Sequence, residues 1–218
     1  KQSFVSGMSA LVTDLKALCE KEEPIYVAIA VLCACAAMML LLDSWLIPFV
    51  FLACMGVTIL YNMGTNYFMG EISYITKALA AVLQLAVTMD YSIFLWHSYC
   101  EEKVRKDSRE EAMAQAVADT VTSVVGSSAT TIAGFLALCF MSYTMGVDLG
   151  IVMAKGVLLG VLGSVTILPA LILVLDKPLE KTRHRSLIPK MDKVVGFITS
   201  KYWIFLVLFL VILVPAVI

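Results

Sequence analysis

Five long apolar runs constrain this chain more than any other feature of its sequence. They cover about residues 25–42, 45–63, 78–98, 120–141 and 149–175, and a sixth run begins at residue 202 and continues to residue 218. A helix needs roughly 20 mainly apolar residues to cross the hydrocarbon core of a bilayer. The sequence therefore predicts an all-α, polytopic membrane protein. Its transmembrane helix bundle would span residues 24–176, and residues 202–218 would start a further transmembrane helix.

The overall composition agrees with a membrane protein. Apolar residues make up 61% of the 218 residues, charged residues only 15%, and the net charge is -1. Soluble domains carry more charge and less apolar surface, and nucleic-acid-binding domains are usually basic. We therefore expect membrane lipids and not nucleic acid as partners. The six cysteines follow no spacing typical of a disulfide framework or a metal site, so no metal is expected.

The positions of Lys and Arg predict the orientation, since positive charges close to helix ends are retained in the cytoplasm. Residues 99–119 carry four such charges and residues 176–201 carry seven. Both connections are therefore expected inside, the second as a basic cytoplasmic connector over residues 177–201. Alternation of the helices then places the turn at Asp43 and Ser44 inside as well, where these residues would end one helix and cap the next.

Two further helices are expected outside the apolar runs. Residues 1–23 carry apolar side chains at a helical period, namely Phe4, Met8, Leu11, Leu15 and Leu18. We interpret this amphipathic helix as the C-terminal tail of an extracytoplasmic domain, with a free interfacial helix as the alternative. The segment from Ser108 to Glu111 has the pattern of a capping box and predicts a cytoplasmic helix over about residues 108–118. The chain opens in mid-pattern at Lys1, so we expect a piece of a longer protein.

Asp90 is the most unusual residue of the apolar runs, because it lies near the middle of residues 78–98. A charged carboxylate at the centre of a bilayer costs about 3 kcal/mol on insertion scales, and an Asp side chain is too short to reach the interface. We therefore predict that Asp90 gains and loses a proton. The alternative is a permanently neutral Asp that only joins helices by hydrogen bonds.

Two neighbours of Asp90 on the same run are candidates for the same proton path. Tyr91 lies roughly 100° further round the helix and can exchange hydrogen bonds with a carboxylate. His97 lies seven residues on, on the face of Asp90 and up to ~10 Å closer to the cytoplasm. It is either a relay or an ordinary interfacial histidine beside Trp96.

The other candidates come from the two later runs. Thr130 and Thr131 fall at about the depth of Asp90 in a helix of small and hydroxylated residues, so one of them would bond to Asp90, line a water path or only pack. Lys155 lies four or five residues outward of the centre of its helix. It either extends outward towards Asp148 or forms an ion pair within the bundle.

The order of these elements resembles a known family. An acid followed by Tyr in mid-helix (MDYSIFLWHSYCEE) precedes a Ser/Thr/Gly-rich helix (SVVGSSATTIAGFLAL) and then VDLGIVMAKGVLLGVLGSVTILPALILVLD. Together they resemble the MMPL family of the resistance-nodulation-division (RND) permease superfamily, over nearly the whole chain. The Asp-Tyr pair alone is a weak signal, whereas this order of elements is specific.

The resemblance implies a protein of two similar halves, in which residues 25–175 are helices two to six of the first half and 202–218 start helix seven. It implies export of lipids or other hydrophobic compounds, driven by proton entry. Asp90 and Tyr91 would be the proton relay, facing a matching pair in the second half of the same polypeptide. The expected location is a bacterial plasma membrane, and no cofactor is expected because the proton gradient supplies the energy.

Three other classes of protein share part of this pattern. A SecD/SecF-like helper of protein export also has an intramembrane Asp, but its usual motifs are not evident. A membrane sensor of the sterol-sensing type shares the helical arrangement but has no need for a titrating acid. An intramembrane aspartyl protease needs two catalytic aspartates, so the chain is not expected to be an enzyme. A second copy of the same protein, in a homo-oligomer, is a further candidate partner.

Overall fold

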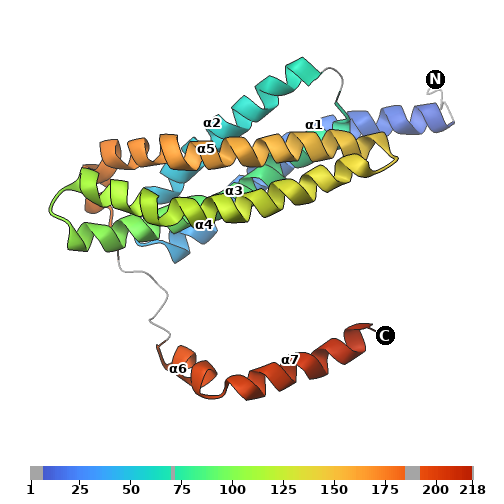
Figure 1. The fold of residues 1–218 in the computed structure, drawn as a ribbon. Coiled ribbons are helices and arrows are strands. Elements are labelled where there is room, and N and C mark those ends of the chain that lie inside the picture. Colours follow the sequence, from blue (N-terminus) through green and yellow to red (C-terminus); the bar gives the residue numbers. More distant parts are fainter. Residues whose placement is uncertain (1–6, 70–71, 185–191, 218) are drawn as a thin grey trace. The chain divides into compact units, whose positions relative to one another are not determined.

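The computed structural model describes residues 7–69, 72–184 and 192–217, and this part of the chain contains helices and connections without a β-strand (Figure 1). The chain divides into two units, Lys1–His184 and Arg185–Ile218. Among the described residues, five helices, all in the first unit, are long and apolar enough to cross a membrane. The predicted fold class, an all-α bundle of membrane helices, is confirmed.

Helical elements follow one another along the described part of the chain. The first unit contains α1 (Met8–Leu41), α2 (Ile47–Thr65), η1 (Asn66–Met69), α3 (Tyr74–Arg105), α4 (Arg109–Ala137), η2 (Leu138–Phe140) and α5 (Thr144–Lys181). The second unit contains α6 (Asp192–Ser200) and α7 (Tyr202–Val217). Helix α7 begins where the sequence predicts a further apolar helix. Residues 1–6, with the predicted apolar Phe4, and residues 185–191 of the basic connector lie outside the described residues.

Helix α1 is one continuous helix and not an amphipathic helix followed by a separate membrane helix. It runs through Pro24, and its 34 residues give a length of about 51 Å, well beyond the ~30 Å hydrocarbon core. A proline inside a helix removes one backbone hydrogen bond but need not end the helix when good helix formers follow on both sides. The assignment of residues 1–23 to an extracytoplasmic domain stays a prediction.

Helix α4 also joins two predicted helices into one. It begins at Arg109, directly after the predicted cap Ser108, and continues without a break to Ala137. The capping box itself does not form: the Ser108 hydroxyl donates to the carboxylate of Glu110 at 2.8 Å, and its oxygen accepts no hydrogen bond from a backbone N–H of the first turn. The helix therefore begins at the predicted residue, but the contact that forms there is not the predicted one.

The turn between α1 and α2 is attached to the end of α5. Ser44 does not cap α2, which begins at Ile47; its hydroxyl instead pairs with the Thr182 hydroxyl at 2.9 Å. The carboxylate of Asp43 accepts hydrogen bonds from Trp96 of α3 at 3.2 Å and from Arg183 at 3.1 Å. These contacts bring the three connections that were predicted to be cytoplasmic to one end of the bundle.

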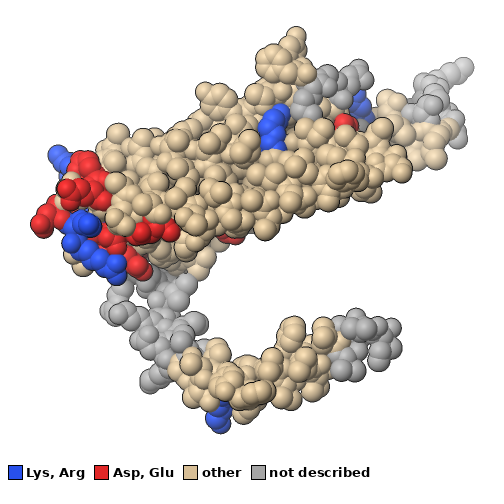
Figure 2. Space-filling model, in the orientation of Figure 1, with Lys and Arg blue, Asp and Glu red and all other residues tan. Residues whose placement is uncertain are grey.

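This end also carries most of the charges of the bundle. Figure 2 shows blue and red residues gathered there, while the long side of the bundle is mainly uncharged. We call it the basic end and define it by Lys103, Arg105, Lys106, Arg109 and Arg183. Its predicted location is the cytoplasm. Helix α5 packs against α2, α3 and α4 and so lies at the centre of the first unit (Figure 1).

Candidate functional site

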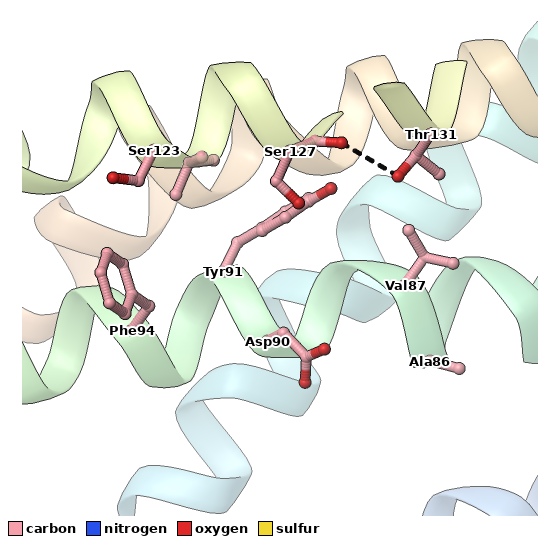
Figure 3. A pocket seen from close by; sticks show the side chains of 9 residues that line it. Ala86, Val87, Asp90, Tyr91, Phe94, Ser123, Ser127 and Thr131 are labelled. Atoms are coloured by element: carbon pink, nitrogen blue, oxygen red, sulfur yellow. Dashed lines mark hydrogen bonds between the residues drawn. The ribbon is translucent and has the colours of Figure 1, made fainter. Parts of the chain in front are cut away.

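A groove runs along α3 and α4 at the middle of the bundle (Figure 3). Its volume is about 550 Å³. It is lined from α3 by Ala86, Val87, Asp90, Tyr91 and Phe94, and from α4 by Ser123, Val124, Ser127 and Thr131. The groove therefore joins the predicted Asp-Tyr pair to the hydroxyl-rich helix that follows it in the sequence.

Asp90 is the charged residue of this groove. It lies within one residue of the middle of the 32-residue helix α3, and its side chain is exposed on the surface of the first unit. Among the described residues, Asp90 has no hydrogen-bond or ion-pair partner. In Figure 3 its carboxyl group points away from α4. The carboxylate is thus open to water or to a further protein surface.

Tyr91 has a different environment from that of its neighbour. Only 6% of its surface is exposed, and it packs with Val124 of α4 and Val161 of α5. Figure 3 shows the ring pointing toward Ser127 of α4. The adjacent residues therefore divide between two sides of α3, as the rotation of about 100° per residue requires.

The two threonines that were predicted to lie at the depth of Asp90 differ in their position relative to the groove. Thr131 lines the groove, and its hydroxyl donates to the Ser127 carbonyl at 3.0 Å (Figure 3). Thr130 is exposed, donates to the same carbonyl at 2.8 Å and is not part of the groove lining. Because both hydroxyls bond to their own helix, neither donates to Asp90.

His97 lies on α3 between the groove and the basic end. It is exposed, and it does not belong to the groove lining. At 1.5 Å per residue it is about 10 Å from Asp90 along the helix axis, which is too far for direct proton transfer. Any transfer between the two side chains needs water between them.

Lys155 contacts the end of α2. Its ammonium group donates to the backbone carbonyl of Asn62 at 3.2 Å and to the side-chain oxygen of Asn66. A Lys that bonds to the last carbonyls of a helix stabilises its C-terminus. Lys155 thus lies within the bundle, beside the end of α2. The sequence did not predict this contact.

A polar contact between α2 and α3 was not predicted from the sequence. Asn62 donates to the side chain of Gln84 at 2.8 Å, and both residues are fully buried. Two polar atoms of this pair, the Asn62 oxygen and the Gln84 nitrogen, have no partner among the described residues. Buried polar residues recur every four positions, as Thr58 and Asn62 on α2 followed by Asn66 at the start of η1, and as Gln84, Thr88 and Ser92 on α3. This spacing was visible in the sequence and could have indicated a buried polar face on each helix, but it does not select which residues pair.

The ion pairs of Asp176 at the basic end were not predicted from the sequence either. This carboxylate is 2% exposed and accepts hydrogen bonds from Tyr99 at 2.9 Å, from Lys103 at 2.6 Å and from Arg109 at 3.3 Å. Lys103 also pairs with Glu180 at 2.7 Å. The network joins α3, α4 and α5. Its partners are 67 or more residues apart in the sequence, so no local pattern indicates them.

Comparisons with known proteins give a consistent result. The model of the MMPL family matches residues 2–203. The chain is 30% identical to the membrane protein ActII-3 of Streptomyces coelicolor over 61% of its own length, which is 19% of that protein. It is 28% identical to MmpL12 of Mycobacterium tuberculosis, named as a transport protein, over 91% of its length and 17% of that protein. It is 26% identical to MmpL5 of the same species, named as a siderophore exporter, over 80% of its length and 19% of that protein.

The chain thus spans about a fifth of the length of these relatives. The family match covers all five long helices of the first unit, including the groove with Asp90 and Tyr91. The resemblance expected from the order of motifs is confirmed, and the chain belongs to the MMPL family.

Proposed function

We propose that this chain is part of a proton-driven, RND-type exporter of lipids or other hydrophobic compounds in a bacterial plasma membrane. Asp90 and Tyr91 are its proton relay, and no cofactor is needed beyond the proton gradient. The family membership and the transporter names of MmpL12 and MmpL5 support the class of activity. They also favour transport over a protein-export helper or a membrane sensor, and over any enzyme activity.

The observation that supports the relay most strongly is the unpaired carboxylate of Asp90 at the middle of α3. A structural, neutral Asp would hold two helices together by hydrogen bonds, and Asp90 makes none to the described residues. A charged carboxylate facing lipid at this depth would cost about 3 kcal/mol or more. The face that carries Asp90 must therefore be covered by protein or water in the complete molecule.

Helix α4 supplies a surface on which a further helix can pack. A Cβ atom added to Gly126 or Gly134 would meet nothing within 4 Å, and the serine and alanine residues around them are largely exposed. Small residues of this kind let membrane helices approach closely. We assign this face to the second half of the same polypeptide, which would close the groove over Asp90.

The proposed cycle uses the charge of Asp90 as its switch. A proton that enters from the outside neutralises the carboxylate, and the neutral side chain is less costly to hold in an apolar contact with the second half. Release of the proton to the cytoplasm restores the charge and the need for water in the groove. The two packings differ in free energy according to the protonation state, so the proton gradient drives alternation between them. The Tyr91 hydroxyl, held between α3 and α4, can donate to a carboxylate from the second half.

The test is a transport assay on the full-length parent protein in sealed liposomes. Asp90→Asn keeps the size of the side chain and removes its ability to exchange a proton. We expect proton flux and gradient-driven movement of a fluorescent lipid probe both to be lost, while the purified protein keeps its unfolding temperature. Asp107→Asn is the matched control, because Asp107 is an exposed carboxylate in the connection between α3 and α4. An Asp90→Asn protein with wild-type proton flux would contradict the proposed relay.

A further inference from the structure

A second cavity lies at the basic end of the bundle, and the proposed transport cycle does not use it. Its volume is about 260 Å³. Its walls come from the α1–α2 turn, from α3, and from the end of α5 with the residues that follow it, and they include Ser44, Trp96, Tyr99, Glu180 and Arg183. The cavity thus joins three segments that lie far apart in the sequence.

Backbone hydrogen bonds hold part of these walls in place. The N–H of Trp45 in the α1–α2 turn donates to the carbonyl of Thr182 at 3.3 Å. The N–H of His184 donates to the carbonyl of Asp43 at 2.8 Å. The residues after α5 are therefore fixed on the α1–α2 turn. A ligand that binds to walls held in this way loses little affinity to the ordering of the protein.

The cavity offers a ligand both a cation and an anion, and Figure 2 shows the two kinds of charge side by side at this end. Arg183 contacts one oxygen of Asp43 through Nε at 3.1 Å and Nη2 at 3.0 Å, and its other N–H donors have no partner among the described residues. Glu180 contacts Lys103 at 2.7 Å through Oε1, while its Oε2 has no partner in the described part of the chain. The side chains of Arg183 and Glu180 are 62% and 60% exposed, so both can reach a ligand.

The depth of the cavity matches that of lipid headgroups. With Asp90 at the centre of the bilayer, Tyr99 lies about 14 Å and Lys103 about 20 Å from the centre along α3. The hydrocarbon core ends about 15 Å from the centre and the headgroup layer about 20–22 Å from it. Trp96 and Tyr99 are also residue types that gather at this interface. The cavity therefore lies where acyl chains meet headgroups.

We propose that this cavity binds the headgroup of a zwitterionic phospholipid of the cytoplasmic leaflet, with Arg183 on the phosphate and Glu180 on the ammonium group. A guanidinium matches a phosphate in geometry and charge, and a primary ammonium can donate to the open oxygen of Glu180. The volume of the cavity equals that of roughly nine water molecules, which is room for a phosphoethanolamine group. The lipid is a resident ligand and not the exported compound, so the site is independent of the proposed proton relay.

The charge balance of the cavity favours a zwitterionic headgroup over an anionic one. Two cations, Lys103 and Arg183, and two anions, Asp176 and Glu180, line it, so the lining is neutral overall. An anionic headgroup would gain the contact with Arg183 but would bring no positive group for Glu180.

The apolar part of the cavity favours a lipid over a soluble phosphate ester. Trp96 lines the cavity about 9 Å from the centre of the bilayer, at the depth of acyl chains. An acyl chain can cover this ring, whereas a soluble ester cannot.

The test measures lipid binding to the full-length parent protein in detergent by native mass spectrometry. Phosphatidylethanolamine is titrated, and phosphatidylglycerol serves as an anionic lipid without an ammonium group. Glu180→Gln should weaken the binding of phosphatidylethanolamine roughly fivefold, the upper range for a half-exposed ion pair, and should not weaken that of phosphatidylglycerol. Arg183→Gln should weaken the binding of both lipids roughly tenfold, because both carry the phosphate.

The matched controls are Glu111→Gln and Lys106→Gln, which remove exposed charges of the same end that lie outside the cavity lining. Both should bind the two lipids as the wild type does. If Arg183→Gln fails to fold because it loses its contact with Asp43, the comparison of the two lipids in Glu180→Gln decides alone.

A Glu180→Gln protein that binds phosphatidylethanolamine like the wild type, or that loses both lipids equally, would overturn the proposal. Displacement of the lipid by an equal concentration of soluble phosphoethanolamine would also overturn it, because the ligand would then be a free phosphate ester. The measurement uses no proton gradient, so its outcome does not depend on Asp90.

Discussion

A Cβ atom on Gly163 of α5 would lie only 2.3 Å from Cγ2 of Thr58 on α2, so the two helices can approach this closely only with a glycine at residue 163. The same relation holds between Gly160 and Thr88 of α3, at 2.0 Å. Side chains of α2 and α3 thus fill the space that the glycines of α5 leave open. This explains why the three helices form the closely packed part of the first unit.

Gly163→Ala should destabilise the protein by about 1–3 kcal/mol, the usual effect of overpacking a filled core. The free energy of unfolding can be measured in detergent for the full-length parent protein. Thr58→Ser should rescue the variant, because it removes Cγ2 and leaves the next atoms 3.8 Å from the new methyl group. Gly56→Ala on α2 is the control, since its Cβ would meet nothing within 4 Å. Equal losses in Gly163→Ala and Gly56→Ala would contradict the packing described here.

Asp176→Asn should also lower stability, because it removes the negative charge that three donors share at the basic end. We expect a loss of about 2 kcal/mol, below the 3–5 kcal/mol typical of a fully buried pair, since Lys103 and Arg109 are partly exposed and Lys103 keeps Glu180. Denaturant unfolding of Asp176→Asn, Lys103→Met and the double variant forms a mutant cycle. A cycle without coupling between the two residues would show that the contact contributes nothing.

Local patterns in the sequence predicted the long membrane helices, and they singled out Asp90, Tyr91 and Thr131, which line the groove, together with Thr130, His97 and Lys155, which do not. Runs of about 20 apolar residues define the helices, and helical periodicity together with depth brought Thr131 to the level of Asp90. Helix ends were harder to predict: α1 passes through Pro24, and α4 absorbs a predicted cytoplasmic helix. Hydrophobicity falls at the membrane surface while the helix continues, so an apolar window ends before the helix does.

The contacts that fix the bundle could not be predicted from one sequence. Asp176 is 73 residues from Lys103, and Asn62 is 22 residues from Gln84. Nothing in the local pattern selects these partners among the other polar residues, because the choice depends on which helices are neighbours in space. The contact of Lys155 with Asn66, 89 residues away, was missed for the same reason.

Lys155→Met tests whether this lysine belongs to the proton path or to the structure. Met is similar in length and removes the hydrogen bonds to Asn62 and Asn66 at the end of α2. Hydrogen bonds from a charged donor contribute about 1.5–3 kcal/mol, so the unfolding temperature should drop. Proton flux per folded molecule should stay near the wild-type value. Loss of flux at unchanged stability would instead place Lys155 in the relay.

Tyr91→Phe separates the hydroxyl of Tyr91 from its ring. Phe preserves the packing against Val124 and Val161, so the unfolding temperature should change little. If the hydroxyl donates a single hydrogen bond during the cycle, its removal costs about 1 kcal/mol, and transport should fall roughly fivefold. Asp90→Asn removes the proton carrier itself and should abolish transport altogether. A Tyr91→Phe protein as inactive as Asp90→Asn would mean that the hydroxyl carries the proton and does not merely orient the carboxylate that receives it.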